Sequence, residues 1–205
     1  MLLKTKNLMK AFGGLKAINK VDFELPAGEI RGIIGPNGSG KSTFFNLVSG
    51  VYDPDPGSYI EFDGHDITNE PPHKIGALGL SRTFQLLRLY QDMSVINNVM
   101  SGYHTRVKYK FFDAVIGRKK IWDQEKEIKD EMMELLSFVG LADYAELNAS
   151  ELSGGQRRLL VLARAIAMKP KLLMLDEPAA GLSPVNVDNL MKIIMQLKDK
   201  YGLTL

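Results

Sequence analysis

One glycine-rich stretch has the residue types and the spacing needed to bind phosphate. Residues 35–43 read GPNGSGKST and match the pattern G-x-x-x-x-G-K-S. Glycines let backbone N–H groups approach phosphate oxygens closely, and a helix that follows adds its unpaired N–H groups and positive dipole end. Lys41 would add a cation for the β- and γ-phosphates, and the Ser42 hydroxyl would be a ligand for Mg²⁺. The stretch predicts a triphosphate site made by Gly35, Pro36, Asn37, Gly38, Ser39, Gly40, Lys41, Ser42 and Thr43.

Two consecutive acids, Asp176 and Glu177, follow the apolar run 171–175. This run is bounded by turn residues and predicts a buried parallel strand. The carboxyl ends of parallel strands form one edge of a sheet, where ligands bind, and the phosphate loop also follows an apolar run. Asp176 could therefore hold a Mg²⁺ that bridges the β- and γ-phosphates, and Glu177 could polarise an attacking water. An ordinary strand end before a proline turn is the competing interpretation, and the phosphate loop upstream disfavours it.

A second glycine turn, LSGGQ, precedes the helical pattern at 157–168. Its members Ser153, Gly154, Gly155 and Gln156 would lie at a helix N-terminus, which is a potential anion site. The turn has no lysine, and Ser153 as a plain helix cap would also explain it. Its place between a helical segment and the strand before Asp176 favours a functional role.

Alternating strand and helix patterns predict an α/β fold around these motifs. Period-two alternation, turn residues and short apolar runs predict strands at 2–8, 21–25, 30–34, 58–62, 80–84 and 171–175. Helical patterns and their capping residues predict helices at 41–50, 73–78, 157–168 and 186–201. The last three residues, 203–205, resemble the start of another strand.

The period changes to 3.6 between Gln85 and about Ser150, which predicts a helical lobe. Within it, residues 104–122 hold six Lys or Arg and one acid, interleaved with aromatic residues. This basic aromatic stretch could face a membrane or a nucleic acid, and a solvated helix face with a packed aromatic edge is the favoured interpretation.

The composition of the chain argues against several classes of protein, among them disulfide-rich and membrane-spanning proteins. The chain has 205 residues, 45% of them hydrophobic, which is enough for a core in one large domain. A net charge of +2 does not suggest a nucleic-acid binder, and the lack of Cys excludes disulfides and Cys-based metal sites. No apolar run is long enough for a membrane span, and the N-terminus lacks a signal-peptide core. We therefore expect a cytoplasmic location, or the cytoplasmic face of a membrane through a partner.

In this order, the motifs resemble those of the ATP-binding-cassette (ABC) ATPases over nearly the whole chain. GPNGSGKST resembles the Walker A motif, Gln85 the Q-loop, LSGGQ the family signature, and LLMLDEP at 172–178 the Walker B motif, with Glu177 as catalytic base. Residues 180–184 resemble the D-loop. The resemblance implies ATP and Mg²⁺ as ligands, with catalytic roles for Glu177, Lys41 and Gln85 and a metal site at Ser42, Gln85 and Asp176.

The resemblance also implies the fold and the assembly. The fold would be a RecA-like P-loop NTPase core with an N-terminal antiparallel β subdomain, at 1–84 and 156–205, and an inserted α-helical subdomain at 85–155. Phe12 lies where the family stacks an aromatic on adenine, with Ala17 beside it. Two subunits would pair head to tail, so that Ser153, Gly154, Gly155 and Gln156 of one close on the γ-phosphate held by the other.

A narrower resemblance is to the LivG-type subunits of branched-chain amino-acid importers. It is carried by PPHKI at 71–75, by GLSRTFQ at 79–85, by the long insert around 109–122 and by DEPAAGLSP at 176–184. It implies an ATP-hydrolysing subunit on the inner face of the cell membrane, bound to transmembrane permease subunits and indirectly to a solute-binding protein. LivG-type sequences often vary the LSGGQ motif, which here has its ordinary form.

One family feature is missing from the 205 residues. The family has a switch His beyond the strand that follows the D-loop, but the three His residues are His65, His73 and His104. The sequence stops at Leu205, partway into that expected strand. We therefore expect a C-terminally truncated domain that binds nucleotide and turns it over weakly.

Two other functions fit parts of the sequence. Some ABC ATPases act on DNA or ribosomes without a transporter, but these typically carry two cassettes or a long coiled-coil insert, and this chain has neither. A small-molecule kinase could use the same phosphate loop, but it would leave LSGGQ unexplained.

Overall fold

The computed structural model describes residues 1–83, 89–103 and 118–205. The chain divides into two compact units. The first unit, called the sheet unit, contains residues 1–82, 170–176 and 196–205. The second, called the helical unit, contains residues 83–169 and 177–195. The basic aromatic stretch lies mostly outside the described residues, and the structure does not test it.

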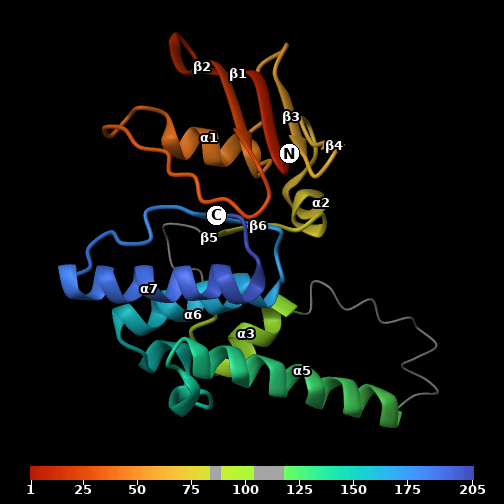
Figure 1. The fold of residues 1–205 in the computed structure, drawn as a ribbon, viewed down its shortest axis with the longest axis vertical. Helices are drawn as coiled ribbons and strands as arrows, with labels where there is room; N and C mark the ends of the chain where they lie inside the picture. The colour runs from red at the N-terminus through yellow and green to blue at the C-terminus, as the bar shows by residue number, and fades with distance from the viewer. Residues whose placement is uncertain (84–88, 104–117) are drawn as a thin grey trace. The chain divides into compact units, whose positions relative to one another are not determined.

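The sheet unit contains a four-stranded antiparallel sheet (Figure 1). Its strands are β1 (Leu3–Phe12), β2 (Leu15–Leu25), β3 (Tyr59–Phe62) and β4 (His65–Asp66), in the order β2-β1-β3-β4. The β1–β2 hairpin runs from the pair Leu3 and Leu25 to the pair Phe12 and Leu15, so both strands extend beyond the segments predicted from alternation. The predicted antiparallel N-terminal sheet is confirmed.

Helix α1 (Lys41–Val48) buries its apolar side chains in the core under this sheet. Phe44 meets Phe23 of β2 edge to face, with 5.3 Å between ring centroids. The same core takes in Ile75 of the short helix α2 (Pro72–Ala77), which begins with a proline at its first position, as predicted. The helix that follows the phosphate loop is thus held by packing against the hairpin.

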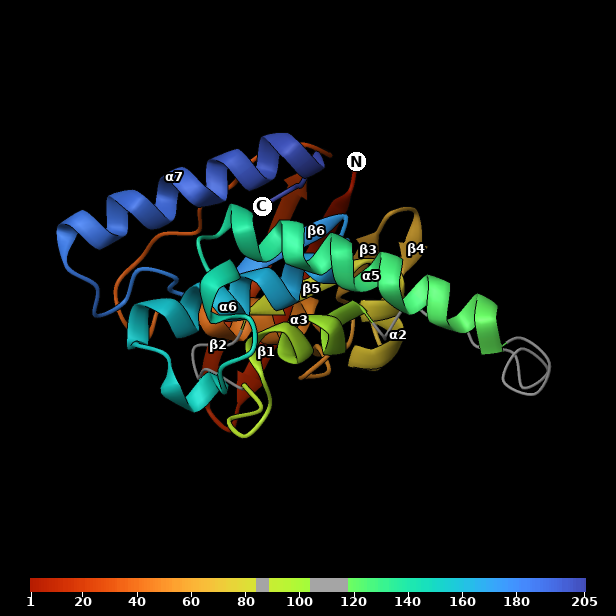
Figure 2. The same cartoon turned by 90° about the horizontal axis from the view of Figure 1, so that it is seen from below.

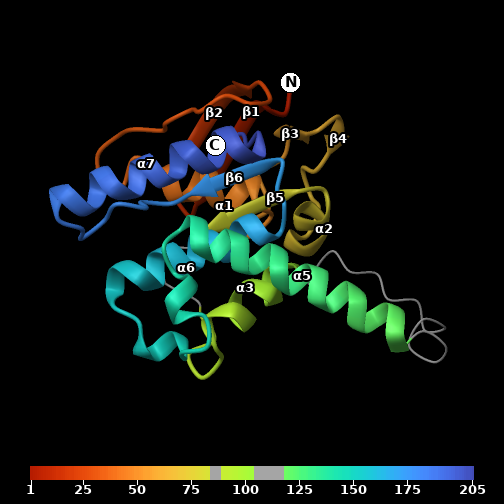
Figure 3. The ribbon, with the colours of Figure 1, turned by 60° about the horizontal axis from the view of Figure 1, so that its bottom comes forward.

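A second, two-stranded sheet pairs β5 (Leu80–Thr83) with β6 (Leu172–Leu175), as Figure 3 shows. Leu172 also forms an isolated parallel bridge with Thr204. Leu172 and Leu173 are buried at 1% exposure, which agrees with the predicted buried strand before Asp176.

The strand predicted at residues 30–34 is not formed, and this prediction was wrong. Residues 26–40 contain no strand, and Ile34 is 94% exposed. Their backbone pairing among the described residues runs through Leu205, whose N–H bonds Glu29 and whose carbonyl oxygen accepts from Arg31. An apolar run becomes a strand only where a neighbouring segment satisfies its backbone groups. Here, within the described part of the chain, Leu205 bonds only to Glu29 and Arg31, at the start of the run.

The helical unit is built mainly from α3 (Val95–Tyr103), α5 (Arg118–Phe138) and α6 (Gly154–Ala167), which pack against one another (Figure 2). Two 3-10 helices, η2 (Ala142–Tyr144) and η3 (Ala149–Glu151), lead into α6. Met132, Leu135, Leu136 and Val139 are all buried, which confirms the predicted apolar face of this segment. The last helix, α7 (Pro184–Tyr201), begins in the helical unit and ends in the sheet unit, where Gly202 has a left-handed φ of 63°.

Candidate functional site

The predicted phosphate loop leads directly into helix α1. Gly40 is the N-cap residue, with φ at 94°, and no side chain caps the helix. The first N–H groups of α1 are therefore available to an anion, and the positive end of the helix dipole lies at the same place. The Lys41 ammonium lies over the loop, where it donates to the carbonyl oxygens of Gly35 at 2.7 Å and Pro36 at 2.9 Å. Both the loop and its cation lie in the sheet unit.

One loop glycine, Gly40, packs too closely against backbone to carry a side chain, and Gly35 has a side chain nearby. A Cβ atom on Gly40 would lie 2.4 Å from the Ala17 carbonyl oxygen, and one on Gly35 would lie 2.6 Å from Ser39 Oγ. Gly38 also has a positive φ, 81°, but open space around it. The backbone of Ala17, on β2, therefore lies directly against the start of α1. This contact places one of the two predicted adenine-side residues next to the phosphate loop.

Replacing Gly40 with Ala should destabilise the sheet unit more than replacing Gly38 with Ala. Both variants put an L side chain at a left-handed φ, which costs about 1–2 kcal/mol. Gly40→Ala adds a clash with the Ala17 backbone, and overpacking of this kind costs a further ~1–3 kcal/mol. Denaturant unfolding of the two variants measures the difference, and equal midpoints would contradict the packing of Gly40 on β2.

Phe12 lies next to the turn of the β1–β2 hairpin, paired with Leu15, and is 44% exposed. Its ring meets Tyr52 edge to face at 5.5 Å, and the Lys10 ammonium lies 5.7 Å from its centroid. An exposed aromatic face can stack on a base, as predicted for adenine. Neither neighbour of Phe12 was predicted. Tyr52 belongs to a segment distant in sequence, and Lys10 lies outside the predicted strands and motifs.

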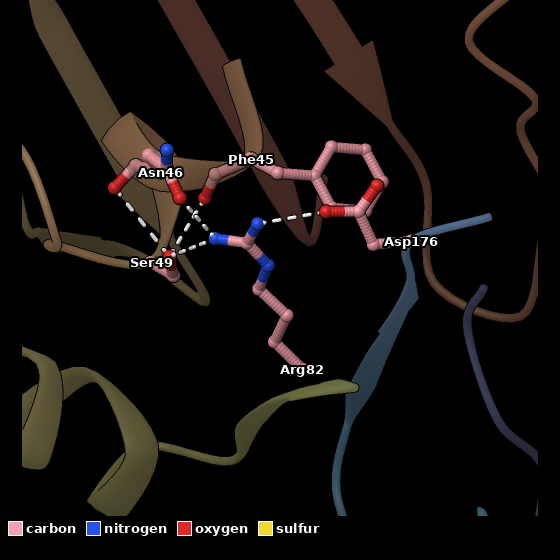
Figure 4. A network of polar contacts seen from close by, with 5 residues as sticks. All are labelled: Phe45, Asn46, Ser49, Arg82 and Asp176. Atoms are coloured by element: carbon pink, nitrogen blue, oxygen red, sulfur yellow. Dashed lines mark hydrogen bonds and ion pairs between the residues drawn. The ribbon is translucent and has the colours of Figure 1, made fainter. Parts of the chain in front are cut away.

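At the end of β6, Asp176 forms an ion pair with Arg82 of β5 at 2.8 Å (Figure 4). The two side chains are 11% and 6% exposed. Arg82 also donates to Asn46 Oδ1 at 2.6 Å and to Ser49 Oγ at 3.1 Å, at the C-terminal end of α1. Sequence reasoning missed this network, although a cation in a short strand next to apolar positions was a signal that it needs a buried partner.

The donor set at Asp176 fits Mg²⁺. One face of α1 begins at Ser42. It continues with Phe45, Asn46 and Ser49, which follow Ser42 by three, four and seven residues. Arg82 joins Asp176 to Asn46 on this face, one helical turn after Ser42. Among the described residues no group of three or more His, Cys, Asp or Glu could hold a metal alone. One hydroxyl and one carboxylate suit an ion that takes its other ligands from phosphates and water.

The second glycine turn begins α6, in the helical unit. Ser153 caps the helix, as the alternative interpretation of this turn expected: its Oγ accepts from Gln156 N at 3.3 Å, and Gln156 Oε1 accepts from Ser153 N at 2.9 Å. Gly154 and Gly155 have open space where a Cβ atom would lie. The turn is thus an exposed helix N-terminus, and its two glycines present no side chain there.

Glu177 adopts a left-handed φ of 48°, which is uncommon for a residue with a side chain. Its carbonyl oxygen accepts from Ala180 N at 3.1 Å, and Arg158 of α6 donates to the Ala180 carbonyl oxygen. Strain of this kind persists only where the surrounding structure holds it and is often found at active sites. Gln85, the third predicted catalytic residue, lies outside the described residues.

Comparison with known proteins assigns these features to one family. The ABC transporter family matches residues 18–180, a span that contains the phosphate loop, the LSGGQ turn and Asp176. The chain belongs to the ABC transporter family. Because this family consists of ATP-binding ATPases, ATP binding and hydrolysis are assigned to the chain, as predicted.

Related ABC proteins match almost the whole chain. A probable branched-chain amino acid transport ATP-binding protein LivG of Archaeoglobus fulgidus is 43% identical over 99% of this chain and 77% of its own length. The high-affinity LivG protein of Escherichia coli K12 is 38% identical over 100% of this chain and 80% of its own. The resemblance to LivG-type subunits is confirmed.

Solved ABC structures confirm the predicted P-loop NTPase fold. The ADP conformation of an ATP-binding cassette of an ABC transporter superposes with a TM-score of 0.83 at 33% identity, covering 99% of this chain and 78% of the other. A nucleotide-free cassette gives a TM-score of 0.81 with similar coverage. None of the helices that the structure describes has the length and apolar character needed to cross a bilayer.

Proposed function

We propose that the protein is the ATP-hydrolysing subunit of an importer for branched-chain or related amino acids. The observation that carries this proposal is the 43% identity to a LivG protein over 99% of the chain. The motifs for phosphate, metal and water activation all lie within the matched region. The transported solute would contact the partner subunits. The residues of this chain therefore account for the use of ATP, and the partner subunits would select the solute.

The working unit is a head-to-tail pair of such subunits. Each ATP would lie between the loop at 35–43 of one copy and the LSGGQ turn of the other. The open space at Gly154 and Gly155 supports this arrangement, because a phosphate can approach the N-terminus of α6 without a steric obstacle. Permease subunits would bind the pair to the inner face of the membrane, and a solute-binding protein would deliver the solute to them.

Each residue has a distinct role in the proposed reaction. Lys41 and the N–H groups of α1 bind the β- and γ-phosphates and stabilise the charge that develops on the transferred group. Glu177 orients water for in-line attack on the γ-phosphate and accepts its proton. Ser42 and Asp176, with Gln85, would hold Mg²⁺, which neutralises charge on the phosphate oxygens. Ser153 and its glycine neighbours donate to the γ-phosphate across the pair.

Purification of a tagged chain from detergent-solubilised native membranes tests the function. We expect two multi-span membrane proteins to copurify, and vesicles of that complex to take up leucine, isoleucine or valine when ATP is present. Uptake of urea or a short amide instead would revise the solute. Isolation without membrane proteins, together with ATPase stimulation by DNA or ribosomes, would overturn the transport function.

Replacing Gly155 with Ala tests the shared site. Ala at a helical position is favoured over Gly by up to about 1 kcal/mol, and no neighbour obstructs its Cβ, so the fold should be at least as stable. The added methyl group would displace the γ-phosphate at the interface, and a misplacement near 1 Å lowers the rate by about 10²-fold.

Gly76→Ala is the matched control, since Gly76 also lies in a helix with open space around it but outside every predicted motif. Phosphate release and ATP-dependent dimerisation should fall in Gly155→Ala and stay normal in Gly76→Ala. Normal activity of both variants would contradict the head-to-tail site.

The 205-residue chain alone should hydrolyse ATP slowly. None of its three His residues lies where the family's switch His contacts the γ-phosphate. Loss of one such contact typically lowers turnover by about 10²–10³-fold. Phosphate release measured beside the E. coli LivG protein checks this expectation, and equal turnover would contradict it.

A further inference from the structure

Arg82 links the end of β6 to the helix that begins at the phosphate loop (Figure 4). We propose that Arg82 is a positioning residue for the Mg²⁺ site, which fixes the Asp176 carboxylate relative to Ser42. This proposal rests on the proposed function, because it assigns a role to a residue beside the same ATP site. It goes further by assigning a role to Arg82, for which no role was predicted from the sequence.

Arg82 is buried, and its guanidinium contacts both the end of β6 and α1. Its side chain is 6% exposed, and a guanidinium at that depth requires partners on several sides. One terminal nitrogen, Nη2, donates to Asp176 Oδ2 at 2.8 Å. The other, Nη1, donates to both Asn46 Oδ1 and Ser49 Oγ. The Phe45 ring lies 5.5 Å from the guanidinium carbon, so α1 contacts the group from two directions.

The geometry explains why an arginine stands at this position. A guanidinium is planar and directs its donors along set directions, whereas a lysine ammonium is a compact charge on a flexible stem. Nη1 and Nη2 face different elements, so the plane of Arg82 sets the distance between β6 and α1. Ser42 lies on the contacted face of α1, three and four residues before Phe45 and Asn46.

The ion pair also leaves part of Asp176 available. The bond from Arg82 uses Oδ2, and no donor to Oδ1 is found among the described residues. One oxygen would thus be fixed by the protein while the other faces the metal. Groups that orient a metal ligand in this way typically contribute about 10–100-fold to metal affinity.

Calorimetric titration with ATP tests the proposal. Affinity is measured once with MgCl₂ and once with EDTA, and their ratio is the Mg²⁺-dependent gain. Arg82→Gln should reduce this gain by about tenfold or more, while affinity in EDTA changes little. Arg82→Lys should recover part of the gain at most. An equal loss under both conditions would mean a purely structural role and would overturn the proposal.

A double-mutant cycle with Asp176→Asn isolates the pair. When Asp176→Asn is already present, adding Arg82→Gln should cause no further loss of the Mg²⁺-dependent gain, and an additive loss would overturn the proposal. If Arg82→Gln does not fold, Asn46→Ala serves instead, because it removes the shorter of the two hydrogen bonds from Arg82 to α1 and keeps the ion pair. That variant should lower the gain, and an unchanged gain would equally overturn the proposal. Failure of the wild-type chain to bind ATP under either condition would count against the proposed function instead.

Discussion

Glu177→Gln should bind ATP normally and lose nearly all ATP turnover. Gln has the size and shape of Glu but cannot accept a proton from the attacking water, and general-base catalysis contributes about 10²–10⁴-fold to a rate. Because Gln can adopt the same left-handed φ of 48° at similar cost, the local backbone should be retained. Blocked hydrolysis should also make ATP-bound dimers accumulate, which size-exclusion chromatography with and without ATP would detect.

The control is Glu146→Gln. Glu146 is also an acid of the helical unit, but its side chain is 77% exposed and pairs with Lys129 on the surface. The Glu146→Gln variant should keep wild-type turnover, and its ATP-dependent shift in size should not exceed that of the wild type. If Glu177→Gln retained wild-type turnover, the assignment of Glu177 as the catalytic base would fail.

Local chemistry made several elements predictable from the sequence. Ser153 caps α6, as the helix-cap interpretation expected, and Gln156 completes a reciprocal cap that needs only residues three positions apart. The loop at 35–43 likewise combines turn, helix start and cation in one stretch, and the structure places Lys41 over the loop carbonyl oxygens. Patterns of this kind depend on neighbours in sequence, which a single sequence displays directly.

Features that depend on distant partners were the ones missed. Residues 30–34 have the composition of a buried strand, but a strand exists only where another segment pairs with it, and local pattern does not show which segment that is. The ion pair between Arg82 and Asp176 joins residues 94 positions apart. The sequence indicates that a cation in a short strand needs an acidic partner. It does not indicate which acid that partner is.

Lys41→Ala should weaken ATP binding strongly with only a modest loss of stability. The ammonium carries three N–H groups, of which two donate to the carbonyl oxygens of Gly35 and Pro36. These bonds hold the cation over the loop with a donor left for a phosphate oxygen. A hydrogen bond to a charged group contributes about 1.5–3 kcal/mol, so the affinity for ATP should fall by about 10- to 150-fold. Titration with ATP in MgCl₂ measures the change.

Lys74→Ala separates this effect from a general loss of positive charge. Lys74 lies on α2 in the same sheet unit, but its side chain is 60% exposed and pairs with Glu70, which precedes that helix. If long-range charge governed binding, the two variants would lose affinity together, and raising the salt concentration would reduce both losses. If Lys41 contacts the phosphates, only Lys41→Ala should lose affinity. A Lys41→Ala variant that bound ATP as tightly as the wild type would show that this glycine-rich loop is not the phosphate site.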